Sequence, residues 1–448
     1  MRRLSSLLVL AAIACSDSDP SSDTAADLAP ETASDVLPDA APDVASDTAL
    51  DITPDSPDDT APDVAIYPHA LTPTPLVSTP FDTLAPLRVQ PALAIGADHR
   101  LAMAWTGRDG DSLGIILALA RLDGATADTV SPFIANTTAT GTRNEPSLCA
   151  LAGGGYALAW SVDLGNGGDN LQVAWRRFAP DLTPLDPADR IVVTDRPGNH
   201  WLAELACDPR GGFVLAGVRP GPPDSGFSAF FVRIAPDGTQ GPAVSALPDP
   251  PGDPIGSSAF LPQLAVDPTG QVVLAWEQVG ACASPPCADD TGLAFRRFPA
   301  AGSPSDLVYF RGASGRDASG SVVAVDPAGD ALLGGILDNR LAFFLDSDGL
   351  APLTLPGSAT VTTSSAAVAT GPNRFAVAYF AGTGSDVAVL YQRLDGTSFS
   401  PSSATLATGS FPLAYRPALA ARDDLRVVAW TESLGQGSFT VRMAAFTD

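Results

Sequence analysis

The stretch Pro262–Trp276 reads PQLAVDPTGQVVLAW, and it decides the fold. An apolar run stands on each side of the four residues Asp-Pro-Thr-Gly. Asp, Pro and Gly favour tight turns because of their backbone preferences and, for Asp, its side-chain hydrogen bonds. A turn of this kind between two apolar runs is typical of a β-hairpin. The stretch therefore predicts two antiparallel strands, and the second strand ends at an aromatic side chain.

The same pattern recurs along the chain, and we number the copies repeats one to seven. They read, in order, PALAIGADHRLAMAW, PSLCALAGGGYALAW, LAELACDPRGGFVLAG, PQLAVDPTGQVVLAW, SVVAVDPAGDALLGG, SAAVATGPNRFAVAY and PALAARDDLRVVAW. Their last residues are Trp105, Trp160, Gly217, Trp276, Gly335, Tyr379 and Trp430. Internal repeats of this length are the signature of a repeat architecture.

Each repeat continues with a loop, a third apolar strand such as FSAFFVRIAPDGT and a weaker fourth strand. Four strands in roughly 55 residues match one blade of a β-propeller. The sequence therefore predicts an all-β fold, a seven-bladed β-propeller with four-stranded antiparallel blades, over residues 67–448. Repeats three and five end in Gly, and repeat six is short, so six or eight blades remain alternatives.

The two ends of this domain resemble each other in a way that predicts ring closure. The chain stops directly after the third strand of repeat seven, where a fourth strand is missing. The segment before repeat one, TPLVSTPFDTLAPLRVQPALA, reads like ATLATGSFPLAYRPALA, which precedes repeat seven. We expect residues 72–87, and Leu76–Phe81 in particular, to supply the missing outer strand, with the blades in residues 88–448. Such closure removes an open sheet edge.

The N-terminus reads as an export signal. Arg2 and Arg3 precede the apolar run Leu4–Ala14, which is too short to span a bilayer but typical of a secretory signal. Residues 1–14 are therefore the expected signal peptide. The sequence Ala-Ile-Ala before Cys15 resembles the lipobox of bacterial lipoproteins, in which this Cys is lipidated, although Ala12 stands where Leu is usual. Cleavage without lipidation remains the alternative.

Residues 15–66 are predicted to form a disordered acidic tether. Acidic residues recur every fourth position from Asp19 to Asp63, and no basic residue interrupts them. Like charges at this spacing repel each other on a helix, and seven prolines break it. The segment also has too little apolar surface to fold. An extended stalk that holds the domain away from a membrane is the expected result.

The five cysteines fit an exported protein. If Cys15 carries lipid, four remain for disulfides or free thiols. Cys282 and Cys287 lie close together in GACASPPCADD, and we take them as the disulfide candidate. Cys149 and Cys207 fall on equivalent strands of neighbouring repeats, where a disulfide and two buried thiols are equally open.

The segments DPTGQVVLAWE, DPRGGFVLAGV and FVRIAPDGTQG resemble the long β-propeller repeats of secreted and surface lipoproteins of Gram-negative bacteria. The resemblance extends over residues 72–448. It implies the fold. The expected address is the outer membrane rather than the inner membrane, because Ser16 follows the anchor Cys15, and the periplasmic face and the cell surface both remain open. Turn and strand signals carry little information about activity.

Two sets of side chains are candidates for a ligand surface. The aromatic residues that end the second strands could form a sugar-stacking ligand face or pack between blades; they are Trp105, Trp160, Trp276, Tyr379 and Trp430. Arginines near the ends of third strands could bind anions or cover strand surface; they are Arg121, Arg177, Arg233, Arg297 and Arg393. No catalytic, metal-binding or cofactor motif is found, so none of these is predicted.

The expected function is that of an envelope-anchored lipoprotein, whose propeller serves as a binding or scaffolding module for a protein or glycan. A propeller-fold enzyme, such as a glycosidase or polysaccharide lyase, is the first alternative, and a structural subunit of an envelope complex is the second. The net charge of −25 argues against nucleic acid as a partner. The membrane, reached through the lipid anchor, is an expected partner, and we expect a monomer.

Overall fold

The computed structural model describes residues 74–79, 90–109, 112–123, 126–129, 132–138, 141–165, 170–221, 226–247, 255–281, 291–310, 318–338, 340–353, 355, 365–383, 386–401, 403–409, 411, 416–435 and 438–447. All of them lie in the compact body Val64–Asp448. The predicted signal peptide, Cys15 and the tether fall outside the described residues, as do Cys282 and Cys287.

The regular secondary structure of the described residues consists of β-strands and one short 3-10 helix, η1 (Asp346–Asp348). The first strands of repeats one to seven are β2 (Ala92–Ile95), β7 (Thr142–Ala150), β11 (Trp201–Cys207), β15 (Ile255–Val266), β19 (Ala318–Val325), β23 (Ser365–Gly371) and β28 (Ala418–Arg422). The second strands are β3 (Arg100–Asp109), β8 (Tyr156–Asp163), β12 (Phe213–Pro220), β16 (Val272–Ala281), β20 (Ala331–Leu337), β24 (Arg374–Thr383) and β29 (Leu425–Gly435).

The third strands are longer than the outer strands that follow them. They are β4 (Ser112–Asp123), β9 (Leu171–Phe178), β13 (Phe227–Ile234), β17 (Thr291–Phe298), β21 (Arg340–Leu345), β25 (Asp386–Asp395) and β30 (Ser438–Thr447). The outer strands are β5 (Thr126–Thr129), β6 (Phe133–Ile134), β10 (Arg190–Ile191), β14 (Val244–Ser245), β18 (Val308–Phe310), β22 (Pro352–Leu353), β26 (Ser398–Phe399), β27 (Ala404–Gly409) and, for repeat seven, β1 (Thr74–Thr79).

Within each repeat, the first strand pairs antiparallel with the second, the second with the third, and the third with the outer strand or strands. Repeats three and four are joined into one eight-stranded sheet, because β13 pairs parallel with β15 at Phe227 and Ser258. The predicted all-β chain of antiparallel four-stranded sheets is therefore confirmed. No helix within the described residues is long and apolar enough to cross a membrane.

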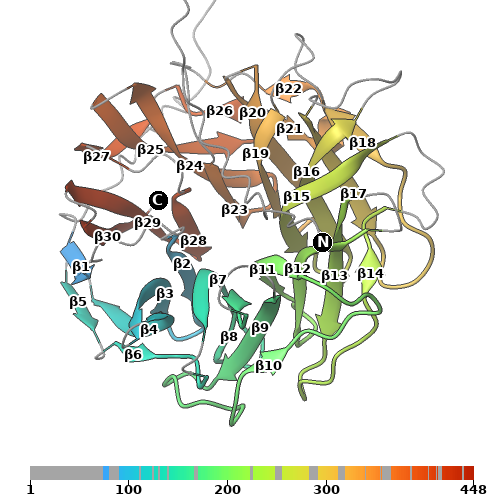
Figure 1. Cartoon of the computed structure of the whole chain (residues 1–448). Helices are drawn as coiled ribbons and strands as arrows, with labels where there is room; N and C mark the ends of the chain where they lie inside the picture. The colour runs from blue at the N-terminus through green and yellow to red at the C-terminus, as the bar shows by residue number, and fades with distance from the viewer. Residues whose placement is uncertain are drawn as a thin grey trace, which may run out of the picture. The chain divides into compact units, whose positions relative to one another are not determined.

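The first strands surround the centre of the ring (Figure 1). Each first strand contacts the first strands of the repeats before and after it, and β28 returns to β2. The contacts therefore close on themselves. The first strands are thus the innermost, and the outer strands form the rim.

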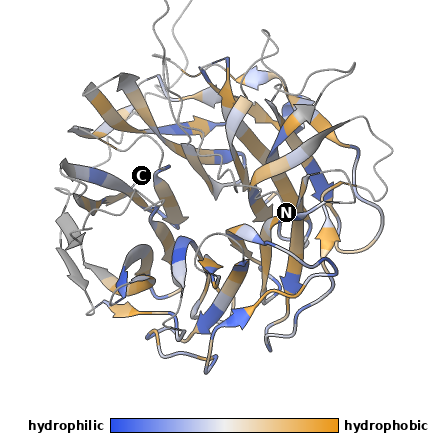
Figure 2. Ribbon diagram, viewed as in Figure 1, coloured by the Kyte–Doolittle hydropathy of each residue, from blue (hydrophilic) through white to orange (hydrophobic). Residues whose placement is uncertain are grey.

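The core lies between neighbouring repeats. The buried apolar side chains form clusters, each of which is shared by two successive repeats. A further cluster joins repeat one to repeat seven, through residues such as Met103 and Met443. Figure 2 shows that the strands of the ring carry many of the hydrophobic residues. Burial of this apolar surface between sheets is the main force that holds the ring together.

The Asp-Pro-x-Gly turns form for a reason that the sequence contains. Asp267 Oδ1 accepts backbone N–H groups from Thr269 and Gln271, each at 2.8 Å. Gly270 has a φ of +81°, which a residue with a Cβ adopts only with strain. The Asp carboxylate and the Gly therefore fix the hairpin that the sequence predicts at this point.

Strand β1 occupies the edge of repeat seven. It pairs antiparallel with β30, with Thr79 opposite Phe439 and Thr74 opposite Met443. The sheet order is β1, β30, β29, β28. The N-terminal part of the domain therefore completes the last sheet, within the range in which the sequence places a closing strand.

Deletion of residues 72–87 is expected to lower the melting temperature by about a few degrees, because β30 would keep β29 but lose β1 as a backbone partner and become an open edge. Thermal unfolding followed by circular dichroism measures the effect. A deletion of equal length in the acidic segment, residues 26–41, is the matched control and should leave the melting temperature unchanged. An equal melting temperature for both deletions would contradict closure by β1.

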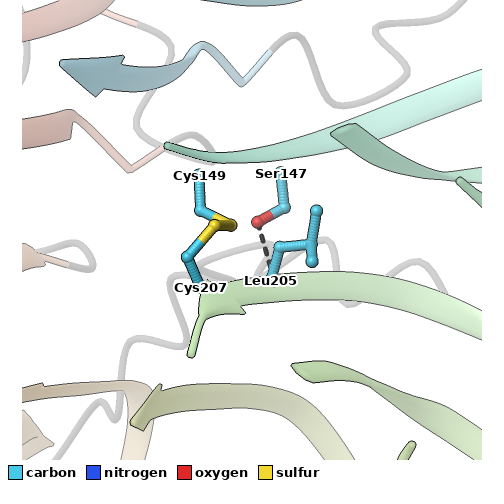
Figure 3. Close-up of a disulfide and its surroundings, with 4 residues drawn as sticks. All are labelled: Ser147, Cys149, Leu205 and Cys207. Carbon is cyan, nitrogen blue, oxygen red and sulfur yellow. Dashed lines mark hydrogen bonds between the residues drawn. A yellow bond between two sulfur atoms is a disulfide. The ribbon is translucent and has the colours of Figure 1, made fainter. Parts of the chain in front are cut away.

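A disulfide links the first strands of repeats two and three. Cys149 of β7 and Cys207 of β11 are bonded, with their Cα atoms 5.6 Å apart (Figure 3). Beside them, the Leu205 N–H donates to Ser147 Oγ at 2.9 Å. This pairing settles the alternative that the sequence leaves open, since neither cysteine is a free thiol.

Candidate functional site

Four consecutive first strands contain a β-bulge at the same level. The register shifts fall between Asn144 and Ser147, Trp201 and Glu204, Phe260 and Gln263, and Ser319 and Val322. The first residue inside each bulge has a positive φ; these residues are Glu145 (54°), Leu202 (60°), Leu261 (45°) and Gly320 (65°). For a side chain larger than Gly, such a backbone costs about 1–3 kcal/mol. Bulges and strain of this kind are concentrated at functional sites, where they re-aim side chains.

Side chains of the neighbouring repeat hold the bulges in place. Ser161 Oγ donates to the Glu145 carboxylate at 3.0 Å and accepts the Leu202 N–H at 2.9 Å. In the same way, the Glu277 carboxylate accepts the Gly320 N–H. The strained backbone is therefore supported across the boundaries between repeats, and Glu145 is linked through Ser161 to the bulge of β11.

Glu204 and Gln263, which follow two of these bulges, lie together with Gln90 and Arg416 in what we call the central cluster. Arg416 Nη2 donates to Glu204 Oε2 at 2.6 Å, and Gln263 Nε2 donates to the same oxygen at 3.2 Å. Gln90 Oε1 accepts from Arg416 Nε at 2.7 Å and from Nη2 at 3.2 Å, in the amide orientation that satisfies both groups.

The central cluster crosses the ring. Glu204 belongs to repeat three and Arg416 to the segment that enters repeat seven, so repeats one and two lie between them on one side. Gln90 and Gln263 come from the entries to repeats one and four. The closed circuit of first strands brings these four positions together although Glu204 and Arg416 are 212 residues apart in sequence. The cluster therefore depends on the complete ring.

The central cluster combines charge with partial access. The side chains of Arg416 and Glu204 are 18% and 16% exposed. A charge-assisted contact in such surroundings is stronger than the same contact in water. The carboxylate can accept hydrogen bonds from hydroxyl groups or a proton from water, and the guanidinium can stabilise an adjacent negative charge. This arrangement suits a polar, hydroxyl-rich ligand.

Of the two alternatives that the sequence leaves open for the recurring aromatic residues, the structure supports packing between blades rather than a ligand face. All five of its rings are at most 3% exposed: Trp105, Trp160, Trp276, Tyr379 and Trp430. Each belongs to an apolar cluster between two repeats. In repeats three and five the corresponding space is filled by other side chains. A Cβ on Gly217 would lie 3.1 Å from the Phe230 ring, and one on Gly335 would lie 2.4 Å from Leu293. Packing between blades therefore explains why five repeats have an aromatic residue at this position and why repeats three and five have Gly.

Three of the third-strand arginines hold neighbouring repeats together. Arg233 Nη2 donates to the Gly270 carbonyl of repeat four at 2.8 Å, and Arg297 Nη2 donates to the Gly329 carbonyl of repeat five at 3.1 Å. The third, Arg177, donates to the Pro236 carbonyl of repeat three. These groups are occupied by protein atoms, so they do not form the anion-binding ring that the sequence left open.

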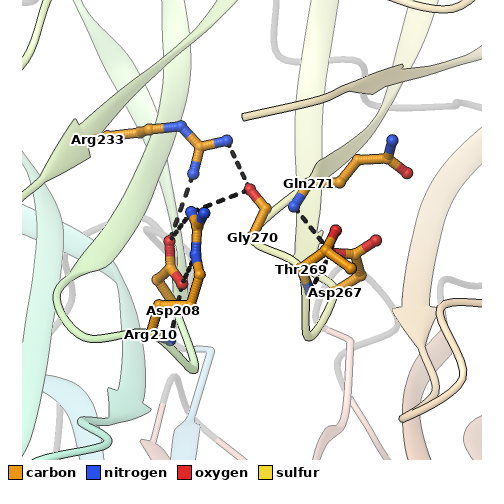
Figure 4. A network of polar contacts seen from close by, with 7 residues as sticks. All are labelled: Asp208, Arg210, Arg233, Asp267, Thr269, Gly270 and Gln271. Carbon is orange, nitrogen blue, oxygen red and sulfur yellow. Dashed lines mark hydrogen bonds and ion pairs between the residues drawn. The ribbon is translucent and has the colours of Figure 1, made fainter. Parts of the chain in front are cut away.

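The contact between Arg233 and Gly270 belongs to a network of polar contacts around the hairpin turns of repeats three and four (Figure 4). Arg210 Nη2 lies 2.8 Å and Arg233 Nη1 lies 3.5 Å from Asp208 Oδ2. Burial alone would raise the pKa of Asp208, but hydrogen bonds from Arg210 and the charge of Arg233 hold the pKa below its usual value. The network is a structural contact between repeats.

No three His, Cys, Asp or Glu side chains gather as a metal site within the part of the chain that the structure describes. Cys15, Cys282 and Cys287 are outside that part, so lipidation and the second disulfide stay predictions.

Sequence reasoning missed the central cluster because it searched the loops for carboxylates. A signal was present: Glu204 interrupts the apolar first strand LAELAC, where the other first strands have Ala, Ser, Gln or Val at the matching position. Gln90 and Arg416 stand in the related segments QPALA and RPALA. A polar residue in an innermost strand is costly without a partner, so it points towards the centre of the ring.

Comparison with known proteins identifies the type of fold. No protein-family model and no curated protein sequence matches the chain. The α-L-arabinofuranosidase of Fusarium graminearum bound to arabinobiose matches with a TM-score of 0.52 and 14% identity, over 84% of this chain and 98% of its own. The polysaccharide lyase Uly1 matches with a TM-score of 0.50 and 9% identity, over 82% of this chain and 91% of its own. At such identities the likeness shows the fold alone, and the chain has a propeller-type fold.

Proposed function

We propose that this chain is a carbohydrate-active enzyme, which cleaves a polysaccharide at the central cluster. The main observation behind this proposal is the ion pair of Glu204 and Arg416. The two residues belong to repeats that are not neighbours, and Glu204 directly follows a bulge with a positive φ. Two solved structures of similar fold are an arabinofuranosidase and a polysaccharide lyase, and this favours the enzyme over the binding module that the sequence puts first. We further propose that the seven repeats are seven blades of one propeller.

The proposed reaction is hydrolysis of a glycosidic bond. Such hydrolysis commonly uses two carboxyl groups, one of which acts on water or on the sugar while the other protonates the leaving oxygen. Glu204, which accepts hydrogen bonds from Arg416 and Gln263, is the carboxyl group that we assign to act on water or on the sugar. Glu145 of the adjacent strand, joined to the β11 bulge through Ser161, is the second carboxyl group.

The direct test incubates the purified protein with a panel of plant, algal and bacterial polysaccharides and measures the release of reducing ends. Product analysis separates the two kinds of cleavage, because a lyase leaves an unsaturated uronate that absorbs ultraviolet light and a hydrolase does not. Absence of any cleavage product from the whole panel would count against an enzyme.

A glycan-binding module is the second candidate. The observation in its favour is that the central cluster is internally paired, since Glu204 already accepts from Arg416 and Gln263, and Arg416 also donates to Gln90. A paired cluster can recognise hydroxyl groups without moving a proton. Retention of a polysaccharide in a pull-down without any cleavage would favour this candidate.

We also propose that the mature protein is anchored through a lipid on Cys15 and stands outside the inner membrane on its acidic tether. The support is the lipobox-like sequence before Cys15 and the acidic, proline-rich segment after it. Metabolic labelling with a fatty acid in a bacterial host should mark the wild type and leave Cys15→Ser unlabelled. An unlabelled wild type would refute the anchor.

A further inference from the structure

One tryptophan differs from the others in its surroundings. The chain has six tryptophans. Five are buried, with exposures of 0–2%: Trp105, Trp160, Trp175, Trp276 and Trp430. Trp201, the first residue of β11, is partly exposed. A large apolar ring at the surface is unusual unless it packs on a neighbour or meets a ligand.

Trp201 belongs to a group of rings that we call the aromatic platform: Trp201, Phe227 and Phe260. The ring centroids of Trp201 and Phe227 are 4.6 Å apart, and the planes meet at 82°. Phe227 in turn lies 5.9 Å from Phe260. All three side chains are partly exposed. The first contact is edge-to-face and the second is tilted, and both restrict the orientation of the rings.

The backbone below the aromatic platform is continuous. Phe227 and Ser258 form the parallel pair that joins the sheets of repeats three and four, and the Phe227 N–H donates to Ser258 Oγ at 3.4 Å. The platform therefore rests on a single sheet, and its rings need little further ordering when a ligand binds.

The aromatic platform runs beside the central cluster. In β11 the bulge separates Trp201 from Glu204, and in β15 the bulge separates Phe260 from Gln263. Each strand thus presents an aromatic residue and, three positions later, a polar residue of the central cluster. Sugars have apolar C–H faces and hydroxyl edges, so they need both kinds of contact at this spacing.

We propose that the aromatic platform is a sugar-binding subsite, in which the face of one pyranose or furanose ring stacks on Trp201 while its hydroxyl groups reach Glu204 and Gln263. This inference rests on the proposed function, since it assigns the carbohydrate its position relative to the central cluster. Trp201 sets affinity and positions the chain, and it takes no part in bond cleavage.

The experiment uses tryptophan fluorescence, because Trp201 is the one partly exposed tryptophan among six. Arabinan, xylan, β-glucan, pectin and alginate are titrated into the purified Glu204→Gln protein, in which cleavage is expected to be too slow to consume the polysaccharide during the titration. We expect at least one of the five to change the emission. Trp201→Phe in the same background should remove that change, and Trp201→Ala should weaken binding about tenfold, measured by calorimetry.

The control is Phe310→Ala. Phe310 lies in the outer strand β18 of repeat four, its side chain is also partly exposed, and its ring stacks on Phe344 with the ring centroids 4.1 Å apart. This substitution should leave the affinity unchanged, and circular dichroism checks that each variant is folded. The subsite is overturned if Trp201→Ala binds as tightly as the control, or if no polysaccharide changes the emission. If the wild type cleaves a polysaccharide and Trp201→Ala has the same KM for it, the subsite is overturned and the proposed function stands. If Glu204→Gln cleaves the polysaccharide as fast as the wild type does, the proposed function is overturned and the subsite stands.

Discussion

Glu204→Gln is expected to lower kcat for polysaccharide cleavage by about a thousandfold, while the protein folds and binds its substrate. A positioned carboxylate that transfers a proton contributes about 100- to 10,000-fold to the rate. Gln keeps the size of the side chain but loses its charge and its ability to accept a proton. Its amide nitrogen can also face the donors of Arg416 and Gln263, which then lose a hydrogen bond. Rates of reducing-end release at saturating substrate measure the effect.

Glu432→Gln is the matched control for this substitution. Glu432 also pairs with an arginine, Arg442, at 2.6 Å, and the two side chains are 28% and 26% exposed. This pair joins the second and third strands of repeat seven and lies outside the central cluster. Loss of a surface ion pair costs about 1 kcal/mol or less, so kcat should stay within about twofold. An equal loss of rate in both variants would show that the effect is general destabilisation rather than catalysis.

The local parts of the fold were predictable from sequence, and the reason lies in the turns. Asp267 and Gly270 fix their hairpin through contacts within five residues, so the pattern is visible in any copy of the repeat. The alternating apolar strands on each side are equally local. The aromatic residues were identified correctly as a repeated feature, but the expectation that the second strand ends at them is wrong: β3 continues from Trp105 to Asp109, and β8 continues from Trp160 to Asp163. Their burial is set by the packing of one repeat on the next and not by the repeat itself.

The central cluster could not be predicted because it depends on ring closure. Arg416 and Glu204 belong to repeats that are not adjacent, and only the closed circuit of first strands makes them partners. The positive φ of Leu202 and Leu261 is equally hidden, since neither residue type favours that backbone. Sequence alone offers the acid in LAELAC and the polar residues of QPALA and RPALA as hints, but nothing local pairs Glu204 with a residue 212 positions away.

Removal of the disulfide between Cys149 and Cys207 is expected to lower the free energy of unfolding by about 4 kcal/mol. The bond closes a loop with a sequence separation of 58 residues, and the chain-entropy model gives a stabilisation of this size for such a loop. For a domain of this length, the loss corresponds to a fall in melting temperature of about 5 °C. Thermal unfolding of the double variant Cys149→Ser, Cys207→Ser against the wild type measures it.

The disulfide also bears on the site, because β7 and β11 carry Glu145 and Glu204 as well as the two cysteines. Ser147 still accepts the Leu205 N–H after the bond is removed, so the strands should stay in register at low temperature and activity there should persist. The control is the wild type after reduction. Its melting temperature should fall to that of the double variant treated with the same reductant. If reduction leaves the wild type more stable than that variant, the loss comes from the serine substitutions, and the bond itself contributes less than the model requires.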